Sequence, residues 1–218
     1  MHGPNAEDIR IVVFDLGGVI VHNVDSWEMA IERAECQPDP FSQDEVFRSE
    51  WSRLASELRI GAISPRTYYE GVSRASAGQY SPADVIRIHS SFMIDQYPGV
   101  SELIDELHGI GVETGALSDT NAPHWHDLMN SERFSTVRKL RRPHASHLLG
   151  YAKPDAEIYR EFERKTGYYG SDILFVDDRP GNVAGAQKLG WHADLIDPGE
   201  NNAAQLRECF IEHGILES

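Results

Sequence analysis

Residues 9–18 read IRIVVFDLGG, a stretch that decides the fold class. The run from Ile9 to Phe14 is nearly all apolar and rich in β-branched residues, which is typical of a strand buried on both faces of a parallel sheet. Asp15 stands at the end of this run, and Gly17 and Gly18 supply the turn that closes it. The stretch therefore predicts a central strand that carries a carboxylate at its carboxyl end.

Further strands with the same pattern are predicted at residues 112–117 and 173–176 and, with a weaker pattern, at residues 193–196. Between them, apolar residues at helical spacing predict helices over residues 100–110, 123–129, 155–165 and 182–189. Alternating strands and helices indicate an α/β fold with a doubly wound, Rossmann-like parallel sheet.

Residues from about 25 to 93 interrupt this alternation. They contain no comparable strand but three helix-start signals, at Ser42-x-x-Glu45, Ser64-Pro65 and Ser81-Pro82. We therefore expect an α/β core domain of residues 1–22 and 95–218 and an inserted helical-bundle cap domain of residues 23–94. Because the insertion follows the first strand, it should cover the carboxyl ends of the strands, where open α/β sheets bind ligands.

The composition narrows the classes of partner. With 20 basic and 35 acidic residues, the net charge is −15, so the average surface repels nucleic acid and anionic membranes. Cys36 and Cys209 are the only cysteines and form no CxxC pair, so neither a disulfide framework nor a thiolate metal site is expected. The apolar run near the first residues is too short for a signal or spanning helix. These features predict a cytoplasmic protein and leave its oligomeric state open.

Four polar motifs follow or lie near the predicted strands: Asp15–Val19 (DLGGV), Leu117–Asn121 (LSDTN), Lys153-Pro154 and Asp177-Asp178. Because the carboxyl ends of parallel strands meet at one crevice, these motifs should lie together. A carboxylate, a hydroxyl, a lysine and a carboxylate pair are what phosphoryl transfer requires. They supply a nucleophile, hard oxygen ligands for Mg²⁺ and donors for the phosphoryl oxygens.

The same motifs resemble those of the haloacid dehalogenase (HAD) superfamily. VVFDLGGVI, LSDTN, YAKP and LFVDDRPGNVAGAQKLGW match its four motifs in order and over nearly the whole chain. GAISPRTYYEGV resembles a cap segment of its small sugar-phosphate phosphatases, and the nearest similarity is to the α-D-glucose-1-phosphate phosphatase-like branch. The resemblance implies a Mg²⁺-dependent phosphohydrolase that acts on a small phosphorylated metabolite, with a sugar phosphate as one candidate.

The resemblance also implies a role for each motif residue. Asp15 would be the nucleophile that forms an aspartyl phosphate, Ser118 would hydrogen-bond a phosphoryl oxygen, and Lys153 would balance the charge on both groups. Candidate Mg²⁺ ligands are the carboxylates of Asp15, Asp178 and Asp177 and the backbone carbonyl of Gly17, and which acid of the pair binds directly stays open. Candidate substrate-binding residues are Gly18, Asp119, Asn121, His124 and Asn182.

Gly17 departs from the pattern of most phosphatases in the superfamily, which carry a second aspartate at that position. This aspartate protonates the leaving oxygen, and such an acid contributes roughly 10²- to 10⁴-fold in rate. We expect either another donor, such as water, a cap residue or His124, or a substrate with a better leaving group, such as an anomeric sugar phosphate.

Two other functions could use the same residues. A metal-independent 2-haloacid dehalogenase would share the Asp15 nucleophile and the missing second aspartate. A phospho-ligand binding or regulatory protein with little turnover would use the motifs only to hold its ligand. Asp177-Asp178 favours the phosphatase, because adjacent like charges at a buried strand end are costly without a cation.

Overall fold

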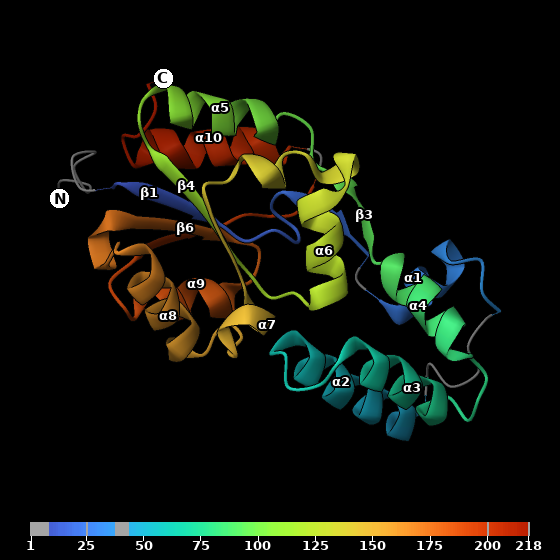
Figure 1. The fold of residues 1–218 in the computed structure, drawn as a ribbon. Helices are drawn as coiled ribbons and strands as arrows, with labels where there is room; N and C mark the ends of the chain where they lie inside the picture. Colours follow the sequence, from blue (N-terminus) through green and yellow to red (C-terminus); the bar gives the residue numbers. More distant parts are fainter. Residues whose placement is uncertain (1–8, 25, 38–43, 200, 218) are drawn as a thin grey trace.

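A five-stranded parallel sheet forms the centre of the protein, in the order β5-β4-β1-β6-β7 (Figure 1). The computed structural model describes residues 9–24, 26–37, 44–199 and 201–217. The five strands are β1 (Ile11–Phe14), β4 (Glu113–Ser118), β5 (Arg142–Ala145), β6 (Ile173–Asp177) and β7 (His192–Leu195). The predicted α/β class with a parallel sheet is confirmed.

The alternation of side chains along β1 explains why its sequence is apolar at every position. Val12 and Phe14 pack into one apolar cluster, with α5 (Val100–Gly109) and α10 (Asn202–Glu212). Ile11 and Val13 pack into another on the opposite face, with α8 (Ala156–Thr166) and α9 (Pro180–Gln187). Figure 1 shows these two helical layers on either side of the sheet. A strand covered on both faces cannot place a polar residue until it ends, and here the first one is Asp15.

The remaining elements of the core connect these layers. They are the helices α6 (Ala122–Asn130) and α7 (Ser146–Leu149) and the 3₁₀ turns Glu132–Phe134, Val137–Lys139 and Gly170–Asp172. At the start of α10, the buried side chain of Asn202 donates hydrogen bonds to the carbonyls of Gly18 and Val19, at 2.7 and 3.0 Å. The last helix thus holds the loop that follows β1.

In the part of the insertion that the structure describes, four helices form the cap: α1 (Trp27–Arg33), α2 (Glu45–Arg59), α3 (Pro65–Ala75) and α4 (Pro82–Ser90). They bury a third apolar cluster of their own, centred on Trp27. Ser64 and Ser81 are the N-caps of α3 and α4, as their sequence signals predict. The predicted signal at Ser42 lies outside the described residues, and the N-cap of α2 is Asp44, which accepts a hydrogen bond from the Phe47 amide.

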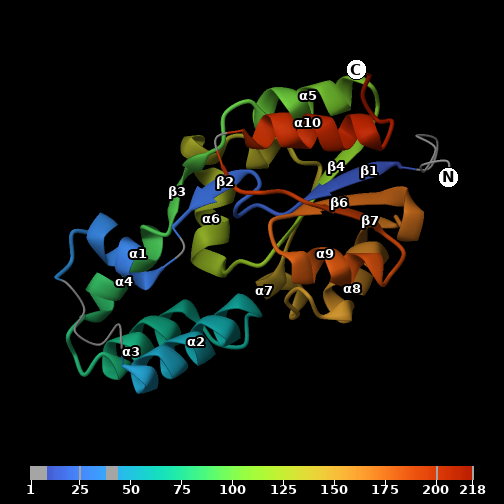
Figure 2. The same cartoon turned by 180° about the vertical axis from the view of Figure 1, so that it is seen from behind.

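A two-stranded ribbon joins the cap to the core (Figure 2). Its strands, β2 (Val21–Asn23) and β3 (Met93–Gln96), are antiparallel, and the register shifts between His22 and Asn23. Such a bulge turns the side chain beside it in a new direction. The expected boundaries between core and cap fall inside this ribbon and stay a prediction.

Several predicted bounds differ from the structure by one or two residues, as element ends commonly do. The sequence patterns missed β5, the ribbon and the helices α1, α7 and α10. β5 lies at the sheet edge, where Arg142 is exposed. Proline has no amide hydrogen to donate to a neighbouring strand, so Pro143 is tolerated at this edge. Among the described residues, no helix is both long and apolar enough to cross a membrane.

Candidate active site

A cavity of about 1050 Å³ lies between the strand ends and the cap. Asp15, Ser118 and Asp178 line it from the ends of β1, β4 and β6, while Arg59 at the end of α2 and Phe92 line it from the cap side. The predicted convergence of the polar motifs at the strand ends is therefore what the structure shows.

Lys153 lies between two carboxylates, one of which, Asp15, lines this cavity. Its Nζ is 3.0 Å from Asp15 Oδ1 and 2.6 Å from Asp177 Oδ2, and its side chain is fully buried. The Leu16 amide donates a further hydrogen bond to Asp15 Oδ1 at 2.7 Å. Both contacts of Asp15 engage the same oxygen, so they fix the orientation of the carboxylate.

The pKa values of Asp15 and Lys153 are both raised, but for different reasons. Burial raises the pKa of Asp15 above its usual value, and Asp177 and Asp178 add to the rise while Lys153 opposes it. Burial works against the charge of Lys153, but Asp15, Asp177 and Asp119 outweigh it and raise the pKa of the lysine. These three acids thus keep Lys153 cationic, which suits a charge-balancing role.

The two acids of the pair are in different situations. Asp177 is fully buried, and its oxygens accept hydrogen bonds from Lys153 Nζ, Asn182 Nδ2 and the Arg179 amide. Asp178 lines the cavity, and its Oδ1 is buried without a hydrogen-bond partner in the described part of the chain. Asp178 is therefore the acid of the pair that is available for a cation.

The site fits a divalent metal ion. Oxygens of Asp15, Asp177 and Asp178 lie within 4.8 Å of one another, an all-oxygen set of the kind that Mg²⁺ prefers. A Cβ atom at Gly18 would lie 2.6 Å from Asp178 Oδ2, and the residue has a φ of +76°. Glycine at position 18 thus lets the first motif approach the acidic pair closely.

Other predicted site residues are placed less directly. Asp119 accepts a hydrogen bond from the Lys153 amide at 2.9 Å, and Asn182 lines the cavity while it holds Asp177. Asn121 caps α6 and is not among the cavity-lining residues. Ser118 is buried at the end of β4 and borders the cavity. The catalytic and binding roles of these residues stay predictions.

Asn23 occupies the space beside Gly17. A Cβ atom at position 17 would overlap with Asn23 Nδ2, and Asn23 also lines the cavity. Its Oδ1 is buried and makes no hydrogen bond with the described residues. The bulge at His22 and Asn23 aims this amide toward the first motif. An amide thus stands where the missing aspartate side chain would begin.

The sequence also matches a known family model. Residues 9–190 match the model of haloacid dehalogenase-like hydrolases. The chain belongs to this family. The HAD-like resemblance expected from the four motifs is therefore confirmed, and the protein is a hydrolase by family.

Relatives of this HAD-like hydrolase differ in their named activities. A sesquiterpene phosphatase of Aspergillus oryzae is 25% identical over 84% of this chain and 77% of the relative. The flavin mononucleotide hydrolase 1 of Arabidopsis thaliana is 33% identical over 52% of this chain, which spans only 45% of that relative. A magnesium complex of a HAD family enzyme from Bacteroides thetaiotaomicron has a TM-score of 0.75 at 24% identity, over 92% of this chain and 99% of that one.

Two further cavity residues were not foreseen from the sequence. Arg59 reaches the HAD-like site from the cap, with its Nη1 3.7 Å from Asp119 Oδ2 and its Nε buried without a partner in the described part of the chain. No local motif marks Arg59, because it is an ordinary last-turn arginine of a helix. No sequence motif marks Asn23 either, because the bulge in the ribbon brings it to Gly17.

Two stacked histidines join the cap to the core. The rings of His89 in α4 and His124 in α6 lie 3.9 Å apart and nearly parallel. His124 Nε2 donates to the His89 carbonyl at 2.8 Å, and the Asn121 amide bridges both rings. His124 borders the cavity, but both its ring nitrogens already have these partners. Its ring therefore links the core to the cap and has no free nitrogen to protonate a leaving group.

We expect this contact to weaken in mild acid. Burial lowers the pKa of His89 and of His124 below the usual 6.5. The unfolded chain then binds more protons, so their contribution to stability is present above pH 6.5 and is lost as the pH falls below it. His89→Phe, which keeps a ring but cannot titrate, should show a smaller fall in melting temperature than the wild type between pH 7.5 and 5.5.

The matched control is His126→Phe in α6, the helix of His124, because His126 lies outside the stack. This variant should keep the wild-type pH dependence. An identical pH dependence of the wild type and His89→Phe would show that the stack does not sense protons.

Proposed function

We propose that the protein is a Mg²⁺-dependent phosphohydrolase that cleaves a small phosphate monoester through an aspartyl phosphate on Asp15. The observation that carries the proposal is that Asp15 and Asp178 line a capped cavity, while the buried Lys153 contacts Asp15. One curated relative is named a phosphatase, and a structural neighbour is a magnesium complex.

The chain's own residues supply the covalent steps. Lys153 and the Leu16 amide hold Asp15 Oδ1, which leaves Oδ2 to attack phosphorus. A P–O bond to Asp15 forms as the bond to the leaving oxygen breaks, and water then cleaves the aspartyl phosphate and returns Asp15 to its free state. Lys153 balances the charge on the phosphoryl group in both steps, as Ser118 donates to one of its oxygens.

Asp15 and Asp178 would hold Mg²⁺, with the carbonyl of Gly17 as a third ligand and Asp177 as the group that positions Lys153. When bound, the ion supplies charge neutralisation between two anions, the carboxylate nucleophile and the phosphate. Asp177 is assigned the indirect role because its oxygens already accept hydrogen bonds from Lys153, Asn182 and the Arg179 amide.

Asn23 shapes the choice of leaving group. Its amide can donate a hydrogen bond to the leaving oxygen but cannot transfer a proton to it at neutral pH. The enzyme should therefore favour phosphates whose leaving oxygen needs little protonation, such as the anomeric phosphates of sugars. Arg59 is placed to pair with a second negative or polar group of the substrate from the cap side.

A phosphate-release screen tests this function. Sugar 1-phosphates, sugar 6-phosphates, nucleotides and simple alkyl phosphates are incubated with the protein, with and without Mg²⁺ and with a chelator. We expect Mg²⁺-dependent release that is fastest for an anomeric phosphate. Chloride release from a 2-haloacid in the presence of chelator would instead identify a dehalogenase, and tight phosphate binding without release would identify a binding protein.

Mg²⁺ should also stabilise the fold, independently of any substrate. A ligand at a hundred times its Kd adds about 2.7 kcal/mol, which raises the melting temperature of a domain of this size by several degrees. Asp178→Asn should abolish this shift, while Asp197→Asn on the exposed loop after β7 should keep it. Equal shifts in the two variants would place the ion elsewhere.

A further inference from the structure

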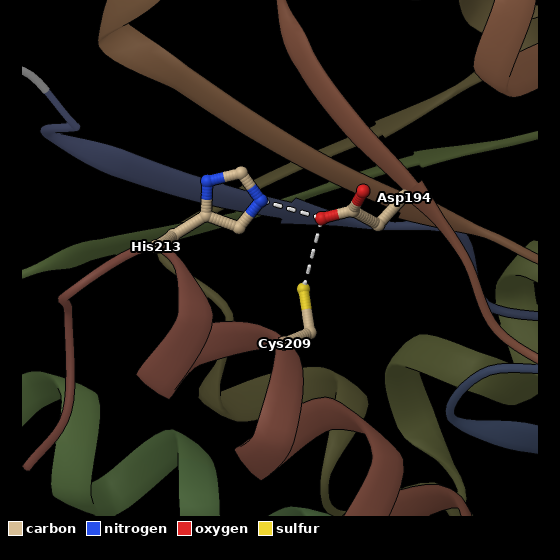
Figure 3. A group of neighbouring side chains, drawn as sticks. All are labelled: Asp194, Cys209 and His213. Carbon is tan, nitrogen blue, oxygen red and sulfur yellow. Dashed lines mark hydrogen bonds and ion pairs between the residues drawn. The ribbon is translucent and has the colours of Figure 1, made fainter. Parts of the chain in front are cut away.

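Figure 3 shows a second cluster of side chains that could hold a metal ion. None of its three residues lines the cavity. Asp194 of β7 contacts two residues at the end of α10, and its Oδ2 lies 2.5 Å from His213 Nε2 and 3.3 Å from Cys209 Sγ. The three donor atoms all lie within 4.8 Å of one another. Among the described residues, it is one of two such groups, and the other is the acidic cluster of the proposed active site.

The fold itself brings these three residues together. Ala193 packs toward α8 and α9, so the neighbouring side chain of Asp194 points to the opposite face, where α10 lies. Cys209 and His213 are four residues apart, a spacing that puts both on one side of a helix. The Asp194 side chain is 41% exposed and that of His213 is 15% exposed, so an ion can reach the group from solvent.

The donor types differ from those of the active site. Sulfur, imidazole nitrogen and one carboxylate oxygen are the ligands of Zn²⁺ and similar transition metals, whereas Mg²⁺ selects oxygen alone. His192, two residues from Asp194 on β7, lies on the same face of the strand, and its ring is 5.6 Å from that of His213. Because the sequence has no CxxC motif, it gave no reason to expect a thiolate metal site. Residues distant in sequence come together in the fold and supply these donors.

We propose that Asp194, Cys209 and His213 form a second metal site that binds Zn²⁺ in preference to Mg²⁺. Binding forms a bond between Cys209 sulfur and the metal and releases the thiol proton to solvent. The fourth position is left to water or to His192. The ion would tie the edge strand β7 to α10, the helix that also holds the Gly18 loop through Asn202. This proposal does not depend on the phosphatase activity.

Without metal, Asp194 accepts hydrogen bonds from His213 and Cys209. Burial, reinforced by Asp194, raises the pKa of Cys209, while the hydrogen bond from His213 lowers the pKa of Asp194. The thiol therefore stays protonated in the metal-free protein and is protected from oxidation, because the thiolate is the reactive form.

Cobalt(II) is the probe that separates the two clusters. Bound to a thiolate, Co²⁺ shows an intense sulfur-to-metal absorption band that an all-oxygen site lacks. Titration of the full chain, with excess Mg²⁺ present, should give this band at one equivalent of Co²⁺, and added Zn²⁺ should remove it. Cys209→Ser should lack the band, and Cys36→Ser, which removes the other cysteine, should keep it.

Two results would overturn the proposal: no thiolate band in the wild type, or a band that persists in Cys209→Ser. Should Cys209→Ser fail to fold, Asp194→Asn keeps the thiol and tests the same site through its Zn²⁺ affinity. Competition with a chelator should show that Asp194→Asn binds Zn²⁺ roughly tenfold or more weakly than the wild type. This is the usual effect of removing a group that binds a metal or supports its ligands. Unchanged affinity in Asp194→Asn would equally rule out the site.

Discussion

Asp15→Asn is expected to reduce phosphate release by roughly 10⁴-fold or more, the scale on which enzymes lose rate when a covalent nucleophile is removed. The amide keeps the shape of the carboxylate but cannot attack phosphorus. The loss should appear in kcat and not in KM alone, because the bond to Asp15 forms only during the reaction. Phosphate release under saturating substrate and Mg²⁺ measures it.

The folded state of this variant provides the control. Because the pKa of Asp15 is raised in the native protein, its ionisation costs stability, and that cost grows as the pH rises above the usual range of an aspartate. Asp15→Asn should therefore melt at the same or a higher temperature than the wild type at pH 8 without divalent ions. An inactive variant with a lower melting temperature would point to misfolding, and full activity would exclude Asp15 as the nucleophile.

Gly17→Asp combined with Asn23→Ala is expected to raise kcat/KM for simple alkyl phosphates by roughly 10²-fold, the lower end of what a general acid contributes. Asn23→Ala clears the amide from beside position 17, and the new carboxyl can then protonate the leaving oxygen. The rate should gain an alkaline limb in its pH profile as this acid ionises. The advantage of anomeric over alkyl phosphates should shrink.

The single variants are the controls for this double exchange. Gly17→Asp alone should lose activity, because its Cβ would overlap with Asn23 Nδ2. Asn23→Ala alone should not gain activity toward alkyl phosphates. The effects of two such neighbouring residues should not add, and a double-mutant cycle measures the coupling. A double variant no faster than Asn23→Ala would mean that Asn23 does not stand in the place of an acid.

Much of the core could be predicted because the buried strands carry their signal locally. β1 and β6 are covered on both faces, so every residue from Ile11 to Phe14 and from Ile173 to Val176 is apolar. β5 gave no such signal, since one side of an edge strand tolerates Arg142 and Pro143. The ribbon strands β2 and β3 are short and mixed in polarity, and only their pairing with each other makes them strands.

The candidate site could be predicted to the extent that its residues follow strands. Asp15, Ser118 and Asp178 stand at or directly after strand ends, and parallel strands bring such residues together. Asn23 and Arg59 reach the cavity through a bulge and through the packing of the cap, and neither depends on a local pattern. The division of labour between Asp177 and Asp178 likewise follows from hydrogen bonds that no spacing encodes.

The ribbon that joins cap and core brings the two ends of the inserted segment close together. Val21 pairs with Gln96 and Asn23 with Met93, so the chain leaves the core and returns to it through adjacent positions. Paired antiparallel residues have Cα atoms about 5 Å apart, a gap that a tight hairpin turn can close. The cap is therefore an exchangeable module: a hairpin turn or another insertion could replace it without a change in the path of the sheet.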